Sequence, residues 1–432
     1  MNDRPNMDRL VTEWLRATAP ARAPERVLTT TLDRVAGVRQ ERLLGGRRFD
    51  DWIGVSPRVR WALVLVVLAA LLATVVGVGA LLRREPPVPR AGASNGWVAF
   101  AEQTPVRGAP STIYLVRDGV PERRLVGSGG YGAGIRAVCP SFSPDGTRLA
   151  YAEATVTPDP LATGSNQPLP GAFLASDRFV VITTLDRAGS SIGTDVRIPV
   201  ETGNGGDACP AWSPDGQRVA YLSGASSSTS SELWVADLNG NTREVRALPV
   251  APSARLAWSP DGTAVAAGDD SALWLVPVAG GEPHLLLASS PGQGSNDFAW
   301  SPDGTQIAEG GTPGRVFRVD DPQQVVKVVV GYNPTWSPDG QELASVQGGA
   351  IVCRGCPYTE ERGAQVFDLL PIRGLIWSPD GKRLLYGEDG GPAGALMTFS
   401  VAGPTGPTPL TQQPHDLEYT GSGSISWQPV FP

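Results

Sequence analysis

One short phrase recurs along most of this chain and restricts its fold more than any other feature. An aromatic residue followed by Ser-Pro-Asp-Gly occurs six times, and each copy runs into a short apolar stretch. Pro presets φ, Ser and Asp hydrogen-bond their own backbone, and Gly accepts a positive φ, so the phrase predicts a tight turn between two strands. The marker aromatics lie 70, 46, 42, 36 and 41 positions apart and are Phe142, Trp212, Trp258, Trp300, Trp336 and Trp377.

Each repeat has room for further strands after its hairpin. Apolar stretches such as Ser231–Ala236 and Ser271–Val276 follow the turn, and each is succeeded by a polar segment and another apolar run. About four strands in a period near forty residues are typical of one blade of a β-propeller. The sequence therefore predicts an all-β propeller over residues 95–432.

Two incomplete copies of the phrase stand at the ends of the array. The segment Ser426–Pro429 contains Trp427 before Gln-Pro but lacks Asp-Gly, and Trp97–Glu102 resembles Arg148–Glu153 but has no turn phrase before it. Each copy supplies what the other lacks, so we expect the last strand to pair with the first and to remove an exposed sheet edge. This predicts seven blades, one of them composite. A six-bladed ring with a divergent extra hairpin is the alternative.

The repeated phrase resembles that of TolB-type β-propellers, which occur in bacterial envelope proteins and as the propeller half of some peptidases. The resemblance covers residues 95–432. It implies the fold and says little about activity, since propellers carry many unrelated functions.

The longest repeat also contains a stretch rich in Pro, Gly, Ser and Asn, Thr155–Ala175, which we interpret as a long loop. Such a loop is either a binding element or an ordinary surface insertion.

A membrane anchor is predicted before the propeller. Residues 61–82 contain no charged side chain, and a helix of this length spans about 33 Å, enough for the hydrocarbon core of a bilayer. Sixty residues precede the apolar run, which argues against a cleaved signal peptide. Five arginines flank the run on its N-terminal side and three on its C-terminal side, so we expect the N-terminus in the cytoplasm and the propeller outside. Residues 83–94 then form a linker.

The first sixty residues carry twelve arginines and eight acidic residues. Apolar residues recur at helical spacing in 8–17 and 25–40, so the sequence predicts two short helical segments. They are either disordered, laid on the inner membrane surface or docked on a partner. A helical segment, one span and an outer domain resemble the layout of membrane-bound anti-sigma factors. The His-x3-Cys-x2-Cys zinc signature of many such proteins is absent, because no Cys or His precedes Cys139.

Four cysteines form two pairs in the sequence. Cys139 and Cys209 each stand three residues before a marker aromatic, and equivalent positions of neighbouring blades approach each other near the axis. They predict a disulfide in an oxidising compartment, with two partly buried thiols as the alternative. Cys353 and Cys356 are compatible with a redox pair, half of a metal site or a local disulfide. Nothing helical follows them, so we favour the local disulfide.

Composition narrows the functional classes. Beyond residue 90 there are 34 acidic and 21 basic residues, which argues against nucleic-acid binding. The chain has only two histidines, His284 and His415, so we predict no metal site, no cofactor and no catalytic residue. We also expect no α/β-hydrolase domain behind the propeller, because the chain ends at Pro432.

The sequence thus favours a non-enzymatic, membrane-anchored module whose propeller binds a protein, peptide or envelope component outside the cytoplasm. Two alternatives stay open. An anti-sigma-like regulator would use residues 1–60 to bind a cytoplasmic sigma factor, and a propeller hydrolase or lyase would use the central channel. The enzyme would need clustered carboxylates or histidines, for which the sequence offers no set.

Overall fold

The computed structural model describes the part of the chain that carries the repeats. The predicted cytoplasmic segment, membrane helix and all but the last residue of the linker lie outside the described residues, and no described helix is long and apolar enough to cross a membrane. All described residues belong to one compact unit, Leu81–Pro432. They are 94–103, 109–127, 133–158, 173–200, 207–224, 230–269, 271–288, 297–354, 372–388, 396–401, 407–411 and 425–430.

Within these ranges every regular element is a β-strand, as the repeat predicted, and all but one of the strand pairings are antiparallel. The first sheet joins two groups of strands through a single parallel pairing of Ser111 with Arg136. Its first group consists of β26 (Ile425–Val430), β1 (Ser94–Gln103), β2 (Ser111–Arg117) and β3 (Val120–Gly127). Its second group consists of β4 (Gly134–Phe142), β5 (Arg148–Pro158), β6 (Phe173–Leu185) and β7 (Ser191–Pro199).

Two four-stranded sheets follow in chain order, each an antiparallel meander. The first contains β8 (Ala211–Trp212), β9 (Arg218–Ser223), β10 (Ser231–Asp237) and β11 (Thr242–Leu248). The second contains β12 (Arg255–Trp258), β13 (Ala264–Gly268), β14 (Ala272–Pro277) and β15 (His284–Ala288).

The last two sheets complete the described strands. In the six-stranded sheet one long strand, β19, pairs with β18 through its first half and with β20 through its second, so it joins two repeats. That sheet contains β16 (Phe298–Trp300), β17 (Gln306–Glu309), β18 (Gly311–Arg318), β19 (Val325–Trp336), β20 (Leu343–Gln347) and β21 (Ala350–Arg354). The final sheet contains β22 (Ile372–Trp377), β23 (Arg383–Glu388), β24 (Leu396–Ser400) and β25 (Thr408–Pro409).

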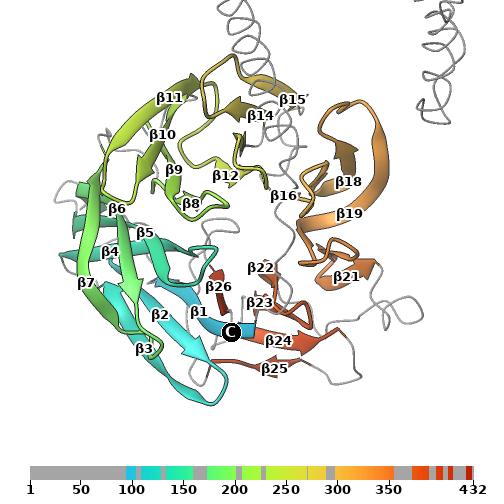
Figure 1. Cartoon of the computed structure of the whole chain (residues 1–432). Helices are drawn as coiled ribbons and strands as arrows, with labels where there is room; N and C mark the ends of the chain where they lie inside the picture. The colour runs from blue at the N-terminus through green and yellow to red at the C-terminus, as the bar shows by residue number, and fades with distance from the viewer. Residues whose placement is uncertain are drawn as a thin grey trace, which may run out of the picture. The chain divides into compact units, whose positions relative to one another are not determined.

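The sheets follow one another around a central region, the radial arrangement of a β-propeller (Figure 1). The strands that end in a marker aromatic, such as β8, β12 and β22, lie nearest the centre, and strands such as β7 and β11 lie outside (Figure 1). We call the former the inner strands. The predicted all-β class therefore agrees with the architecture of the described residues.

The Ser-Pro-Asp-Gly phrase forms the turn between each inner strand and the next strand. In the second repeat the Ser213 amide donates to Arg218 O at 2.8 Å, and the Gly216 amide donates to Ser213 O at 2.9 Å. The Ser213 hydroxyl also donates to Asp215 and accepts the Arg218 amide at 2.9 Å. Gly216 has φ +67°, which its lack of a side chain makes accessible. The same arrangement of bonds recurs at Ser143, Ser259, Ser301, Ser337 and Ser378.

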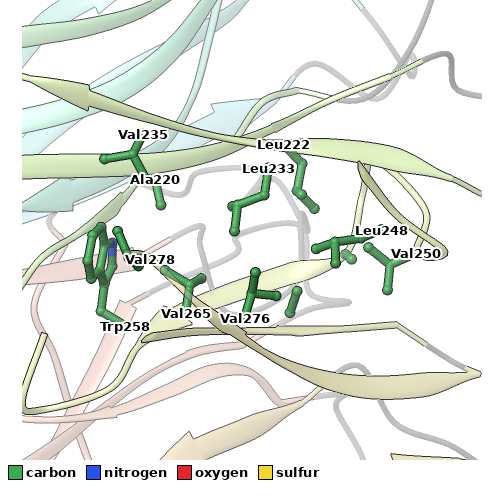
Figure 2. Close-up of a cluster of buried hydrophobic side chains, with 12 residues drawn as sticks. Ala220, Leu222, Leu233, Val235, Leu248, Val250, Trp258, Val265, Val276 and Val278 are labelled. Atoms are coloured by element: carbon green, nitrogen blue, oxygen red, sulfur yellow. The ribbon is translucent and has the colours of Figure 1, made fainter. Parts of the chain in front are cut away.

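Apolar faces of consecutive sheets pack against each other. Between the sheets β8–β11 and β12–β15, for example, Leu222, Leu233 and Val235 meet Val265 and Val276 (Figure 2). Alternating side chains along each strand place these residues on one face. A similar cluster lies between the last sheet and the first, where Leu385 and Leu396 pack against Val98 and Phe100.

The long insertion differs from the loop predicted over Thr155–Ala175. Strands β5 and β6 continue past the body of the sheet, with Val156 opposite Ala175 and Pro158 opposite Phe173. The ends of the segment are therefore a β-hairpin stem, and only residues 159–172 lie outside the described ranges. The sequence pattern missed this stem because its Thr, Val and Leu residues stand among turn-forming residues. The two segments become strands because they pair with each other.

Candidate functional site

The marker tryptophans connect each sheet to the preceding one. Trp212 Nε1 donates to the main-chain oxygen of Ser141 at 2.9 Å, and Trp258 Nε1 donates to that of Ala211 at 2.9 Å. In both cases the acceptor residue directly precedes the previous marker aromatic. The bond recurs from Trp300 to Ala257, from Trp336 to Ala299 and from Trp377 to Thr335 at 3.3, 3.3 and 3.1 Å. These indoles serve the packing between sheets.

A row of six residues, three of them polar, stands three positions before the markers, on the inner strands or on the segments that lead into them. We call it the inner-strand row, and it comprises Cys139, Cys209, Arg255, Asp297, Asn333 and Gly374. Cys139, Asn333 and Gly374 have φ of +55°, +51° and +60°, and the strand register shifts at each of these three places. A bulge of this kind re-aims a side chain relative to the regular pleat.

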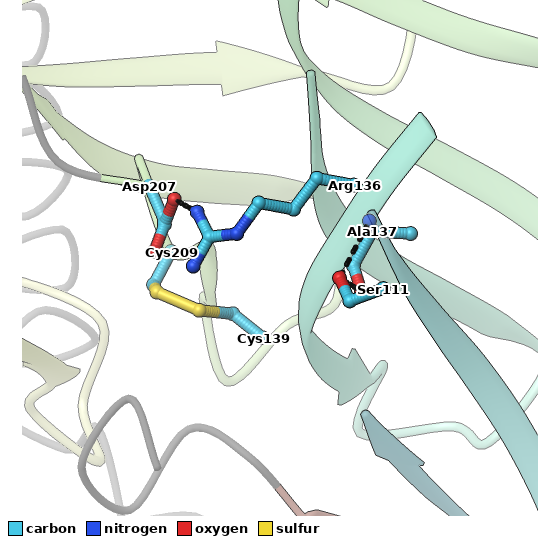
Figure 3. Close-up of a disulfide and its surroundings, with 6 residues drawn as sticks. All are labelled: Ser111, Arg136, Ala137, Cys139, Asp207 and Cys209. Carbon is cyan, nitrogen blue, oxygen red and sulfur yellow. Dashed lines mark hydrogen bonds and ion pairs between the residues drawn. A yellow bond between two sulfur atoms is a disulfide. The ribbon is translucent and has the colours of Figure 1, made fainter. Parts of the chain in front are cut away.

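The first two members of the row are joined covalently. Cys139 and Cys209 form a disulfide with a Cα–Cα distance of 5.3 Å, and it links β4 to the segment that leads into β8 (Figure 3). Both sulfur-bearing side chains pack with Val138 and Ala152. The bond spans 70 residues of sequence, and this stretch includes the long insertion.

The next members of the row form a polar chain. Arg255 Nη1 lies 3.7 Å from Asp297 Oδ1, and the backbone N–H of Asn333 donates to Asp297 Oδ2 at 3.3 Å. The side-chain nitrogen of Asn333 also donates to Asp297 Oδ2, at 3.1 Å. Asp297 is 6% exposed, so this carboxylate depends on its neighbours for the hydrogen bonds that water would otherwise supply.

A second ion pair stands beside the disulfide. Arg136 on β4 pairs with Asp207, two residues before Cys209 (Figure 3). The pair lines a small cavity together with Arg178 on β6. Burial lowers the pKa of the Arg178 guanidinium, an effect that Asp207 opposes and Arg136 reinforces. Nearby, Glu153 is 8% exposed and pairs with Arg197 at 2.5 Å. Charges of both signs are thus concentrated on this side of β4–β7.

Apolar side chains are exposed next to this polar set. Ile135, beside Arg136, is 38% exposed, and Tyr332, beside Asn333, is 46% exposed. Exposed aromatic and apolar groups adjoining fixed polar groups are a composition typical of recognition surfaces. The set formed by the inner-strand row, the Arg136–Asp207 pair and these two side chains is our candidate functional site.

The carboxylates of the turn phrase are held by their own turns. Ser337 Oγ donates to Asp339 Oδ1 at 2.6 Å and lowers the pKa of Asp339, burial opposes this, and the Gln341 amide lowers it further. In four other turns burial raises the pKa, but hydrogen bonds from Ser and backbone amides outweigh it, so the net direction is again downward. These residues are Asp145, Asp215, Asp303 and Asp380.

Metal and nucleophile chemistry find little support in the described ranges. No group of three or more His, Cys, Asp or Glu residues gathers there in a way that could hold a metal ion. Within these ranges one complete Gly-x-Ser-x-Gly string, Gly189–Gly193, occurs where β6 turns back into β7. A nucleophile elbow requires a strand-to-helix turn, whereas this string lies in a strand-to-strand hairpin. Cys353 at the end of β21 is disulfide-bonded, and Cys356 lies outside the described residues.

The incomplete seventh phrase has its own local structure. We call the pairing of β26 with β1 the seam, and its register places Trp427 opposite Val98 and Pro429 opposite Asn95. Gln428 stands where the complete phrase has Ser. Its Oε1 accepts the Trp97 amide at 2.9 Å, and its Nε2 donates to Gly146 O at 2.7 Å.

Part of this arrangement can be recognised in the sequence. Cys139 and Cys209 stand at the same offset from their markers, and the same offset in the later repeats gives Arg255, Asp297 and Asn333. No sequence signal pointed to Arg136 and Asp207, because their approach depends on the bulged path of β4 beside the next sheet.

Comparisons with known proteins add a likeness of fold. No family model matches the chain, and no curated protein matches it in sequence. Among solved structures, TolB from Acinetobacter baumannii is similar at TM-score 0.44 and 16% identity, over 77% of this chain and 66% of that one.

Two further structures are similar. The β-propeller domain of the Trilobed protease from Pyrococcus furiosus matches at TM-score 0.42 and 13% identity, over 64% of this chain and 85% of that domain. A putative TolB from Agrobacterium tumefaciens matches at TM-score 0.34 and 18% identity, over 52% of this chain and 89% of that one. All three TM-scores lie below 0.5, so the function of this chain has to be argued from its own residues.

Proposed function

We propose that this protein is a single-pass membrane protein whose β-propeller lies outside the cytoplasm and serves as a non-enzymatic binding module. Its partner is a protein, peptide or envelope component, bound over the inner-strand row and the neighbouring Ile135 and Tyr332. Residues 1–60 lie in the cytoplasm, residues 61–82 cross the membrane, and residues 83–94 link the membrane to the propeller.

The observation that carries this proposal is the Cys139–Cys209 disulfide. Disulfides persist in oxidising compartments and are rare in the cytosol. An apolar stretch of membrane-spanning length before the propeller and an excess of arginine on its N-terminal side agree with that placement.

We further propose that the propeller has seven blades and is closed by the seam. Buried apolar clusters support this count, since one lies between each pair of consecutive strand groups and another joins the last group to the first. The composite blade then consists of β26, β1, β2 and β3, and the pairing of β26 with β1 covers the inner edge of β1.

The nature of the site supports binding rather than turnover. Its charged groups are already engaged, as in the Arg136–Asp207 pair and the Arg255–Asp297–Asn333 chain. Prearranged polar groups beside an exposed tyrosine give orientation and specificity to a protein contact without any reacting group.

Membrane topology is tested on the full chain with reporter fusions. Alkaline phosphatase, active only outside the cytoplasm, and a green fluorescent protein that folds only inside are each inserted after residue 50, with the rest of the chain following, or fused after residue 432. We expect phosphatase activity from the C-terminal fusion and fluorescence from the N-terminal one. The reverse pattern, or fluorescence at both positions, contradicts the proposed placement.

Binding is tested by photo-crosslinking in intact cells. A benzoylphenylalanine replaces Tyr332 in the candidate site or, as a matched control, Leu285 on the outer strand β15, which is equally exposed at 48% against 46%. We expect a discrete adduct from position 332 that is lost in the Asp297→Ala background, and none from position 285. Equal adducts from both positions, or none from position 332, refute the proposed surface.

A further inference from the structure

In two sheets the inner-strand row is held by the next strand of the same sheet. Arg255 lies opposite Gly268 in the pairing of β12 with β13. In the following sheet the Gly310 amide donates to Asp297 O at 2.8 Å. The backbone at both row positions is therefore fixed from within its own sheet.

Cys209 lacks this support in the described part of its sheet. The inner strand β8 has two residues, and it pairs with β9 through these alone. We call residues 207–210, which precede β8, the Asp207 segment. Among the described residues it is joined to β4 by the disulfide and by the ion pair of Asp207 with Arg136, and Ala208 adds the packing of one methyl group. The disulfide thus takes the place of strand pairing.

The two sulfurs of this disulfide differ in their access to solvent. Cys209 is partly exposed, whereas Cys139 is 2% exposed. A disulfide opens when a thiolate reaches one of its sulfurs, so access directs attack to Cys209 and makes Cys139 the leaving group. Arg136 stands beside the bond (Figure 3), and a neighbouring cation favours a departing thiolate.

We propose that the Cys139–Cys209 disulfide is a redox-sensitive switch that keeps Asp207 on Arg136 and that a dithiol opens. One thiolate of the dithiol attacks Cys209 Sγ, and Cys139 Sγ leaves with the bonding electron pair and takes up a proton. The second thiol of the dithiol then attacks the mixed disulfide, which frees Cys209 and closes a disulfide in the reductant. Two electrons and two protons pass to the protein.

Opening the switch changes the charge of the candidate site, so this role rests on the proposed binding function. Two cations and two carboxylates line the small cavity there, namely Arg136, Arg178, Glu153 and Asp207. Without the disulfide the ion pair holds the Asp207 segment weakly, because the cost of desolvation offsets much of the attraction between the charges. Once Asp207 leaves, the lining is positive, and the reduced site attracts an acidic group of a partner more strongly than the oxidised site does.

Arginine-specific labelling tests the switch without a partner. The full chain in detergent is treated with phenylglyoxal, and mass spectrometry quantifies the adduct at Arg136 and, as a control, at Arg255, whose strand is held by pairing. The samples are the oxidised parent, the parent reduced with dithiothreitol and alkylated, and the oxidised variant Asp207→Asn. We expect the Arg136 adduct to rise about threefold or more in the last two samples, because this side chain is 14% exposed while the site is closed. The Arg255 adduct should stay constant.

A double variant isolates this disulfide from that of Cys353, which reduction also opens. Labelling of Arg136 in Cys139→Ser, Cys209→Ser should match that of the reduced parent. Unchanged labelling of Arg136 in both samples overturns the proposal, because the ion pair then stays closed without the disulfide. An equal rise at Arg255 also overturns it, because the bond then supports the whole fold. Neither outcome bears on the crosslinking test of the proposed function, which uses a different residue.

Discussion

The six complete turns and the seam solve the same structural problem with different residues. In a complete turn, Ser213 Oγ accepts the amide of the next strand's first residue, Arg218, at 2.9 Å. At the seam that next strand is β1, and the equivalent amide is that of Trp97, which Gln428 Oε1 accepts at 2.9 Å. No turn joins the two strands there, so a longer side chain replaces serine. The hydrogen bond is retained although the covalent connection is lost.

The difference shows what a turn contributes beyond connectivity. A complete phrase fills the space beside the next tryptophan, and the glycine of each turn lies against the proline of the previous one, as Gly262 does against Pro214. The seam preserves the strand pairing but not this filling, and a cavity of about 220 Å³, lined by Arg383, Asp118 and Trp427 among others, lies there. Two strands can therefore be held together without a covalent turn between them, but the close packing that a turn provides is then lost.

The largest expected effect comes from breaking the seam. Deletion of residues 425–432 removes β26, exposes the hydrogen-bonding edge of β1 and strips Ile425 and Trp427 from the cluster that joins the first and last sheets. We expect loss of cooperative unfolding and a tendency to aggregate. Urea unfolding followed by tryptophan fluorescence and light scattering checks this. A cooperative transition at the parent midpoint would show that the seam does not hold the array together.

Removing the covalent link of the inner-strand row should have the next largest effect. The double variant Cys139→Ser, Cys209→Ser releases a loop closed over 70 residues, for which chain entropy gives a loss of about 4 kcal/mol in the free energy of unfolding. Urea titration under oxidising conditions measures it. The control is the parent under reducing conditions, which should lose at least as much stability as the variant, since reduction also opens the disulfide of Cys353. A loss below about 1 kcal/mol would mean that packing, not the disulfide, holds β4 to the next sheet.

Replacing the seam glutamine separates its two hydrogen bonds. Gln428→Ala leaves the Trp97 amide and the Gly146 carbonyl without partners in a buried position, and should cost about 3 kcal/mol. Gln428→Glu keeps the acceptor and should cost less. The matched change in a complete turn, Ser213→Ala, should cost about 1–2 kcal/mol because the covalent turn remains. Equal costs for Gln428→Ala and Ser213→Ala, measured by urea unfolding, would show that the seam depends on Gln428 no more than a turn depends on its serine.

The smallest effect is acid sensitivity of the complete turns. The pKa values of the turn aspartates, such as Asp339, are lowered in the folded state, so their contribution to stability is full above the unfolded pKa of about 3.9. It is lost as the pH falls below that value and through the folded pKa. Asp339→Asn should therefore narrow the difference between the urea midpoints at neutral and acidic pH. The seam has no such aspartate, so Gln428→Glu should not narrow the difference between the urea midpoints at neutral and acidic pH.

How far the sequence could predict this molecule varies with the kind of residue. The strand before each marker and the turn after it were readable because Pro, Asp and Gly act on their immediate neighbours. The hairpin stem at Val156 and Ala175 was not, because its strands pair across an insertion of turn-forming residues. The Cys139–Cys209 disulfide could be predicted because both cysteines stand at the same distance before a marker aromatic. Arg136 and Asp207 stand at different distances before their markers and meet only through a bulge.

The sequence by itself determined the repeated local unit, the positions of its turns and the existence of one incomplete copy, because these depend on backbone preferences within a few residues. Only the tertiary structure decided which side chains meet at the seam. It placed Gln428 on the Trp97 amide, set Arg383 against Asp118 and left a cavity where a seventh turn is missing. Those contacts join residues more than 260 positions apart, and no local preference encodes the distance between them.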